Sequence, residues 1–152
     1  MKSLKWIILL VSMWTLGACS DGAYEPREIN QETDVCSICN MSVTSVDFAA
    51  QAVLKNSDIL VFDDLGCLMA YIQQNGDEEI GAAYIRDANS IKWLNVKDAS
   101  YVYSKDYWTP MNYGVLAFVS AEEAAQYMKE QPGEIKRYDE LLTFNWGVHD
   151  HE

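Results

Sequence analysis

The same order of elements is predicted twice along the chain, and this repeat restricts the fold more than any other feature of the sequence. In each half, two strands are followed by a helix with a capping residue at its start, and then by a third strand. Three pairs of residues match at a constant spacing of 56: Phe62 with Phe118, Asp64 with Ser120, and Tyr71 with Tyr127. We therefore predict an α+β fold of two similar ββαβ units packed together.

The first half of the repeat is predicted from strand-like apolar runs and turn signals. Strands are expected over residues 48–54 and 59–62, with a hairpin turn between them. Asp64 is the expected N-cap of a helix that ends near Gly76, and a third strand is expected over residues 81–86. The apolar face of this helix consists of four residues: Leu65, Leu68, Met69 and Ile72.

The second half follows the same order with shorter elements. Strands are expected over residues 101–104 and 113–119. Ser120 is the expected N-cap of the second helix, and Glu123 three residues later completes a capping box. A last strand is expected over residues 135–138. The predicted folded units are therefore residues 34–98 and residues 99–143.

The first residues of the chain have the order of features of a bacterial lipoprotein signal peptide. Lys2 and Lys5 precede an apolar run over residues 6–16, which is shorter than the ~20 residues of a membrane-spanning helix. The run ends in Leu16-Gly17-Ala18-Cys19, which resembles a lipobox. We predict that residues 1–18 are removed and that Cys19 is acylated; the alternative is an uncleaved anchor in which Cys19 is incidental.

Acylation of Cys19 would place the protein outside the cytoplasm. Several acyl chains give stable anchoring, so the expected location is the outer face of the cell membrane or the periplasmic side of a bacterial membrane. Polar residues without periodicity predict a flexible tether over residues 19–33. Residues 144–152 are predicted to be a C-terminal tail that carries both histidines of the chain, His149 and His151.

The charge of the chain restricts its partners. The sequence has 11 basic and 23 acidic side chains, with a net charge of −12, and two of the basic ones lie in the predicted signal peptide. Nucleic-acid binding requires neutralisation of phosphates by Lys and Arg, so this class is excluded. Anionic lipids would repel the folded part, and attachment to the membrane is expected through the lipid alone.

Apart from Cys19, the chain has three cysteines, Cys36, Cys39 and Cys67. An odd number cannot close into internal disulfides, so at least one thiol is expected to be free or bound to metal. Cys67 lies one position from the apolar face of the first helix, and its predicted role is that of a small buried residue.

The segment Cys36-Ser-Ile-Cys39-Asn-Met41 places three sulfur groups within six residues. Thiolate and thioether are soft donors that favour Cu(I), which accepts two or three ligands. Three other interpretations of the segment remain open: a thiol–disulfide redox pair, half of a zinc site, and a structural disulfide. Only the copper interpretation gives Met41 a role.

With the lipobox and the repeated halves, this Cys-x-x-Cys-x-Met segment resembles the NosL family of accessory lipoproteins for nitrous oxide reductase. The family form has Gly at the position of Asn40, and Asn adopts the left-handed backbone conformation more readily than most residues. Further matching segments are Phe62-Asp63-Asp64, Tyr84-Ile85-Arg86-Asp87 and Thr109-Pro110-Met111.

The resemblance implies a copper carrier with one Cu(I) per chain. It implies delivery of copper to nitrous oxide reductase, whose catalytic centre is a copper–sulfide cluster, and partnership with a membrane ABC-type maturation complex. Five residues correspond to ligands or their neighbours: Cys39 and Met41 as core ligands, Met111 as the next candidate, Asp34 as a weak ligand or acceptor beside the site, and Cys36 as an optional thiolate.

Motifs of catalysis are missing from the sequence. It contains no G-x-S-x-G, no H-E-x-x-H and no glycine-rich phosphate loop. No histidine lies within the predicted units to act as a general base, and we therefore predict that the protein is not an enzyme. The alternatives are a thiol–disulfide oxidoreductase that uses Cys36 and Cys39, and a lipoprotein that serves only as a scaffold.

Overall fold

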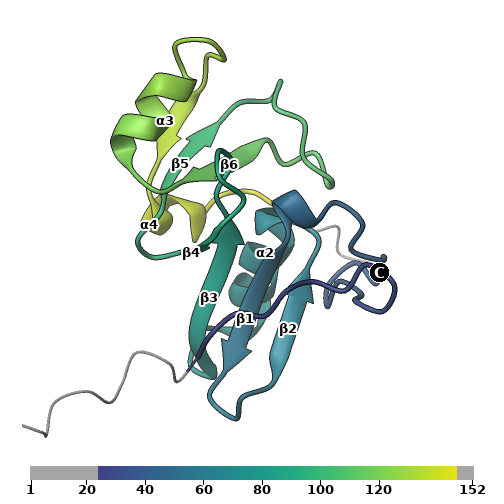
Figure 1. Ribbon diagram of the computed structural model, residues 1–152. Helices are drawn as coiled ribbons and strands as arrows, with labels where there is room; N and C mark the ends of the chain where they lie inside the picture. The colour runs from purple at the N-terminus through teal and green to yellow at the C-terminus, as the bar shows by residue number, and fades with distance from the viewer. Residues whose placement is uncertain (1–23, 147–152) are drawn as a thin grey trace, which may run out of the picture.

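The structure is a computed structural model that describes residues 24–146 (Figure 1). The predicted signal peptide with Cys19, and the two histidines His149 and His151, lie outside the described residues. Between residues 24 and 146, no helix has the length and apolar character needed to cross a membrane.

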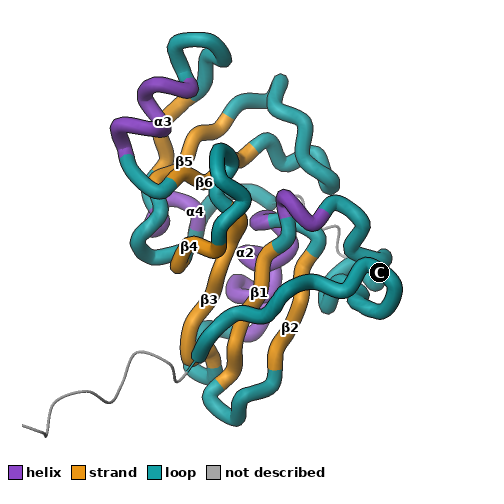
Figure 2. The backbone as a smooth tube through the Cα atoms, in the orientation of Figure 1, coloured by secondary structure: helices purple, strands orange, loops and turns teal. Residues whose placement is uncertain are grey.

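The first unit is a four-stranded antiparallel sheet with one long helix on one face (Figures 1 and 2). Its strands lie in the order β2-β1-β3-β4, so the first strand of the unit is central. A short 3-10 helix, η1, precedes the sheet. The elements are η1 (Val46–Phe48), β1 (Ala50–Leu54), β2 (Ile59–Phe62), α2 (Leu65–Asn75), β3 (Ile80–Arg86) and β4 (Trp93–Asn95).

The second unit repeats this topology in a smaller form. Its three strands lie in the order β6-β5-β7, and its first strand is again central. The elements are β5 (Ser100–Tyr103), β6 (Val115–Phe118), α3 (Ala121–Tyr127), β7 (Glu134–Lys136) and the single-turn helix α4 (Tyr138–Leu141). The predicted α+β fold of two ββαβ units is confirmed.

Local capping explains where the two main helices begin. The Asp64 carboxylate accepts a hydrogen bond from the Cys67 N–H at 3.2 Å, and the Ser120 hydroxyl accepts one from the Glu123 N–H at 3.2 Å. Each bond satisfies a backbone donor that the first turn of a helix leaves free. The two predicted N-caps therefore occupy equivalent positions in the two units.

The loop before β6 shortens the strand that was predicted over residues 113–119. Asn112 and Gly114 have positive φ angles of 60° and 69°, which do not fit an extended strand. The Thr109 hydroxyl accepts hydrogen bonds from the backbone N–H groups of Tyr113 and Gly114, at 2.9 and 3.3 Å. This turn delays the start of β6 to Val115.

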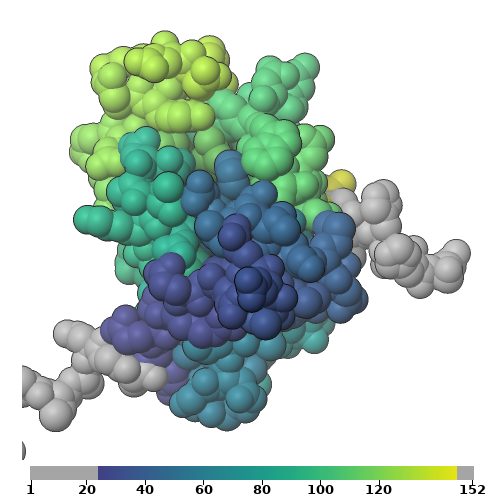
Figure 3. Space-filling model, turned by 45° about the vertical axis from the view of Figure 1, so that its right-hand side comes forward, coloured from purple at the N-terminus to yellow at the C-terminus, as the bar shows by residue number. Residues whose placement is uncertain are grey.

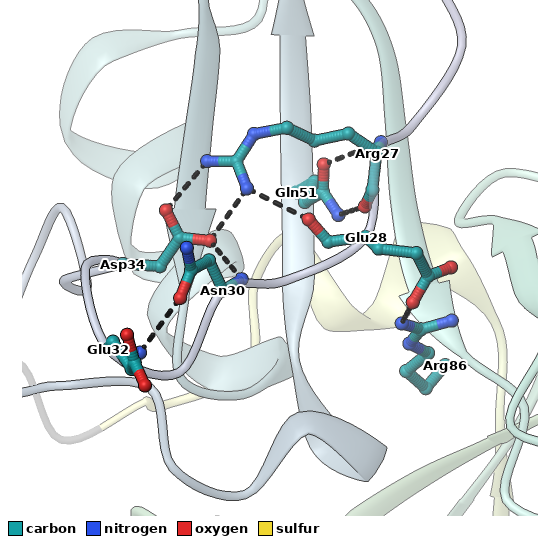
Figure 4. A network of polar contacts seen from close by, with 7 residues as sticks. All are labelled: Arg27, Glu28, Asn30, Glu32, Asp34, Gln51 and Arg86. Carbon is teal, nitrogen blue, oxygen red and sulfur yellow. Dashed lines mark hydrogen bonds and ion pairs between the residues drawn. The ribbon is translucent and has the colours of Figure 1, made fainter.

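The predicted tether is packed against the first sheet from Tyr24 onward (Figure 4). The buried Gln51 side chain on β1 accepts a hydrogen bond from the Arg27 N–H at 3.2 Å and donates one to the Arg27 carbonyl at 2.5 Å. Glu28 forms an ion pair with the largely buried Arg86 of β3 at 2.7 Å. The difference from the predicted flexible segment arises because these polar side chains have partners that are distant in the sequence.

The predicted tail also differs from the structure, because its first residues belong to the core. Trp146 is 1% exposed, and its indole N–H donates to the Leu141 carbonyl at 2.9 Å. Its ring lies 5.4 Å from that of Tyr113 and 4.8 Å from that of Phe144. Aromatic side chains bury large apolar areas, so Trp146 fastens the end of the described chain to the core.

Trp146→Ala is expected to lower the free energy of unfolding by about 3–5 kcal/mol, because truncation of a buried aromatic ring leaves a cavity. Denaturant unfolding of the variant and of Leu142→Ala measures this difference. Leu142 is 37% exposed and serves as the control. An unfolding free energy for Trp146→Ala close to that of the control would show that residues 144–146 do not stabilise the fold.

Arg27→Ala is expected to loosen the N-terminal segment around Asp34, since the guanidinium joins Arg27 to Asp34 by hydrogen bonds of 2.6 and 2.7 Å. Limited proteolysis should then cut the segment faster, while the melting temperature of the remainder changes little. Lys55→Ala, which removes another cationic side chain from the first unit, is the control. Equal cutting rates for the two variants would contradict the proposed fastening.

Candidate metal centre

Three thiols that are separated in the sequence converge in the first unit. The Sγ atoms of Cys36, Cys39 and Cys67 all lie within 4.8 Å of one another. Cys36 and Cys67 are completely buried, whereas Cys39 is partly exposed. All three are free thiols, so no disulfide joins the cysteines of residues 24–146. The group has one side that solvent reaches, at Cys39.

Cys36 and Cys39 are brought together by a tight hairpin-like loop. The Cys36 N–H donates to the Met41 carbonyl at 2.9 Å, and the Asn40 N–H donates to the Cys36 carbonyl at 3.0 Å. Asn40 has a φ of 59°, which confirms the predicted left-handed conformation. The Ser37 N–H donates to the Val61 carbonyl at 2.8 Å and thereby attaches the loop to β2.

Cys67 enters the group from the first turn of α2. The helix follows β2 after a short turn and is capped by Asp64, so its third residue faces the loop that β2 holds. The predicted burial of Cys67 is correct, but sequence reasoning did not place it with the other thiols. The odd number of cysteines was the one signal in the sequence that pointed to a partner for the loop.

The environment of Cys36 favours its thiolate form. The Cys67 S–H donates to the Cys36 sulfur, the backbone N–H groups of Cys39, Ile38 and Asp63 also donate to it, and together they lower the Cys36 pKa to about 5 against the opposing effect of burial. The same hydrogen bond, together with burial, raises the pKa of Cys67. These hydrogen bonds therefore favour the thiolate at Cys36 and the protonated thiol at Cys67.

Cys39 has a different electrostatic character from Cys36. Burial raises the pKa of the Cys39 thiol, and the neighbouring Cys36 sulfur raises it further. Thiols must lose their protons to bind metal as thiolates. A cation placed among the three sulfurs would therefore displace protons from Cys39 and Cys67, while Cys36 is already prepared for it.

The second unit reaches the thiol group through residues 109–113. The Met111 N–H donates to the second oxygen of the Asp64 carboxylate at 3.1 Å. Tyr113 places its ring directly against Gly66 of α2, where an added Cβ would lie 1.9 Å from Cδ2 of the ring. Burial is the main cause that raises the pKa of Tyr113 to about 12, with a smaller contribution from the Asp64 carboxylate.

The predicted ligands other than the cysteines occupy different environments. Met41 is 46% exposed at the end of the loop, whereas Met111, like Cys39, is partly buried and packs against the core that contains Cys36 and Cys67. Both oxygens of Asp34 are bonded to Arg27, and one also accepts from the Asn30 N–H at 2.8 Å. Asp34 therefore fastens the N-terminal segment, and a role for it or the methionines in metal binding stays a prediction.

Comparisons with known proteins agree on one family. The sequence model of the NosL family matches residues 26–143. The crystal structure of the copper chaperone NosL from Shewanella denitrificans superposes with a TM-score of 0.67 at 16% identity, covering 77% of this chain and 95% of that one. At this identity the superposition shows a shared fold. Comparison with curated proteins finds no match.

The Cys36 thiolate should be visible in a pH titration of ultraviolet thiolate absorbance. One thiolate is expected at neutral pH and should be lost as the pH falls through about 5, and Cys36→Ser should abolish this transition. Cys67→Ala should move it to higher pH, because the donating S–H is removed.

The same titration has a consequence for stability. The folded pKa lies below the ordinary thiol value of ~8.5, so ionisation of Cys36 stabilises the fold fully above that value and loses this effect as the pH falls toward about 5. Urea unfolding of metal-free wild type and Cys36→Ser across this range measures the contribution. Parallel pH profiles for the two proteins would contradict the assigned thiolate.

Proposed function

We propose that this chain, which belongs to the NosL family, is an extracytoplasmic copper carrier that binds one Cu(I) among Cys36, Cys39 and Cys67. The observation that carries the proposal is the convergence of three free thiols within 4.8 Å. Thiolates are soft ligands that select Cu(I), and three of them can satisfy its low coordination number. A carrier only has to bind and release the metal, and this chemistry needs no general acid or base.

The unequal exposure of the three thiols suits transfer of an ion. Cys36 and Cys67 are buried, Cys39 is partly exposed, and Met41 is 46% exposed two residues after Cys39. A thioether binds copper more weakly than a thiolate. Met41 would therefore hold the ion briefly at the solvent side, and Met111 would do so from the second unit, while the buried thiolates hold it in transit.

The acceptor in this proposal is the assembly of the copper–sulfide centre of nitrous oxide reductase, with the membrane ABC-type maturation complex as a partner. Support comes from family membership and from the copper chaperone of the same fold. Acylation of Cys19 would hold the carrier at the membrane beside that complex. The protein would act as a carrier rather than an enzyme, because its cargo leaves chemically unchanged.

A thiol–disulfide oxidoreductase is the second candidate, and one observation favours it. A thiol with a lowered pKa, as at Cys36, is typical of reactive redox cysteines. However, the first cysteine of such a motif normally begins a helix, whereas Cys36 and Cys39 lie in a loop closed by the Asn40 turn. The redox interpretation needs Cys67 only as a hydrogen-bond donor to Cys36, whereas the copper proposal uses it as a ligand.

Competition for Cu(I) between a chromophoric chelator and reduced, unlipidated residues 20–152 tests the proposal. Wild type should bind one Cu(I). Cys36→Ser, Cys39→Ser and Cys67→Ser should each weaken binding by roughly tenfold or more, since a ligand should contribute at least as much as the groups that orient it. Met41→Leu should weaken binding less, and Met128→Leu is the control for loss of a thioether.

Cu(I) affinity and function of the same variants together separate the alternatives. Wild type that does not compete for Cu(I) would refute the copper proposal, and unchanged affinity in Met41→Leu would remove Met41 from the ligand set. Loss of function in Cys36→Ser with copper binding intact would instead favour the oxidoreductase. A simple scaffold should tolerate loss of all three thiols.

A further inference from the structure

A cleft of about 430 Å³ lies between the two units, and its lining includes Asp64, which also accepts a hydrogen bond from the Cys67 N–H. Its walls come from η1, the end of β3, the loop after β3, the loop before β6, and β6 itself. Figure 3 shows blue and teal segments of the first unit meeting green segments of the second on one face of the molecule. The cleft is therefore built by both units.

Large apolar side chains stand in solvent at the mouth of this cleft. Trp108 is 63% exposed. Its ring packs edge-on against that of Phe48 in the first unit, with 5.2 Å between the ring centroids. Ile91 on the loop after β3 is 43% exposed and lines the same cleft. An exposed tryptophan beside a cleft is typical of a surface that binds another protein.

Ile91 is held in a conformation that its own side chain disfavours. Its φ is 61°, in the left-handed region that β-branched residues rarely adopt, at a cost on the order of 1–3 kcal/mol. The Arg86 guanidinium donates to the Ile91 carbonyl at 3.0 Å, and the Ile91 N–H donates to the Asp87 carbonyl at 2.9 Å. Asn or Gly would fit this turn better, so folding alone does not account for an exposed isoleucine there.

The charges of the cleft indicate the kind of partner that fits it. Asp47, Asp64 and Asp106 line the cleft, and Asp47 and Asp106 are exposed. The one basic side chain in the lining, Arg86, is already paired with Glu28 at 2.7 Å. With a net charge of −12 for the whole chain, this surface complements a basic segment.

The floor of the cleft is connected to the thiol group. Asp64 lines the cleft, and its two oxygens accept from the N–H groups of Cys67 and Met111 at 3.2 and 3.1 Å. Trp108 lies three residues before Met111 in the same loop. An occupant that contacts Trp108 therefore acts on a loop that is bonded to the cap of the helix carrying Cys67.

We propose that this cleft docks the protein that receives the copper, through a segment with an apolar side chain flanked by Lys or Arg. The apolar side chain contacts Trp108 and Ile91, and the basic flank faces Asp47 and Asp106. The proposal rests on the proposed function, because it assigns the docking surface of a copper carrier.

The test uses the full chain in lipid vesicles and two probes, copper-free nitrous oxide reductase and the membrane ABC-type maturation complex. Three variants change the cleft: Ile91→Asn, Trp108→Ala, and Asp47→Lys combined with Asp106→Lys. Two matched controls lie outside the cleft lining: Ile135→Ala, whose side chain is 45% exposed on β7, and Glu122→Lys on α3.

The cleft variants should bind Cu(I) as wild type does, yet bind one of the two probes roughly tenfold more weakly and transfer copper to it more slowly. The charge reversal should act mainly on the association rate. Ile91→Asn should keep or raise the melting temperature, because Asn tolerates the left-handed backbone. Thus Ile91→Asn decides the question even if Trp108→Ala fails to fold.

Two results would overturn the inference while leaving the copper site intact: cleft variants that bind and transfer like the controls, or wild type that binds Cu(I) but neither probe. Failure of wild type to bind Cu(I) would instead refute the proposed function. Docking would then still be measured with copper-free protein, where equal binding by cleft variants and controls counts against the cleft.

Discussion

The carboxylate of Asp64 connects the two units where the thiol group is assembled. One oxygen caps α2 through the Cys67 N–H, and the other accepts from the Met111 N–H of the second unit. Burial raises the pKa of Asp64 to about 6, so the carboxylate loses part of its charge only in mildly acidic solution. Asp64 thus contributes at once to the start of α2, the position of Cys67 and the contact between the units.

The packing of Tyr113 on Gly66 reinforces this connection and explains why the thiol group stays compact. No side chain larger than hydrogen fits at Gly66, since the ring of Tyr113 occupies that space, and the rings of Tyr113 and Trp146 pack edge-on. Close-packed aromatic groups leave little room for movement. Two thiols are therefore excluded from solvent, and Cys39 alone gives access to the group.

Much of the fold was predictable because the relevant signals are local. The caps Asp64 and Ser120, and the strand boundaries of β2, follow from residues within one turn or one hairpin. The N-terminal segment was misjudged because its order depends on Gln51 and Arg86, which lie far along the chain. The burial of Trp146 was not predicted either, since a short tail shows no periodicity.

For the candidate site, the sequence by itself determined the soft-donor segment at Cys36, Cys39 and Met41, the left-handed Asn40 that closes its loop, and the repeated ββαβ order. Tertiary structure alone decided that Cys67 is the third thiol, that Asp34 is engaged by Arg27, and that a cleft joins the units at Asp64. The physical reason is distance along the chain: loop conformation depends on adjacent residues, whereas the convergence of sulfurs requires β2 and α2 to pack against that loop.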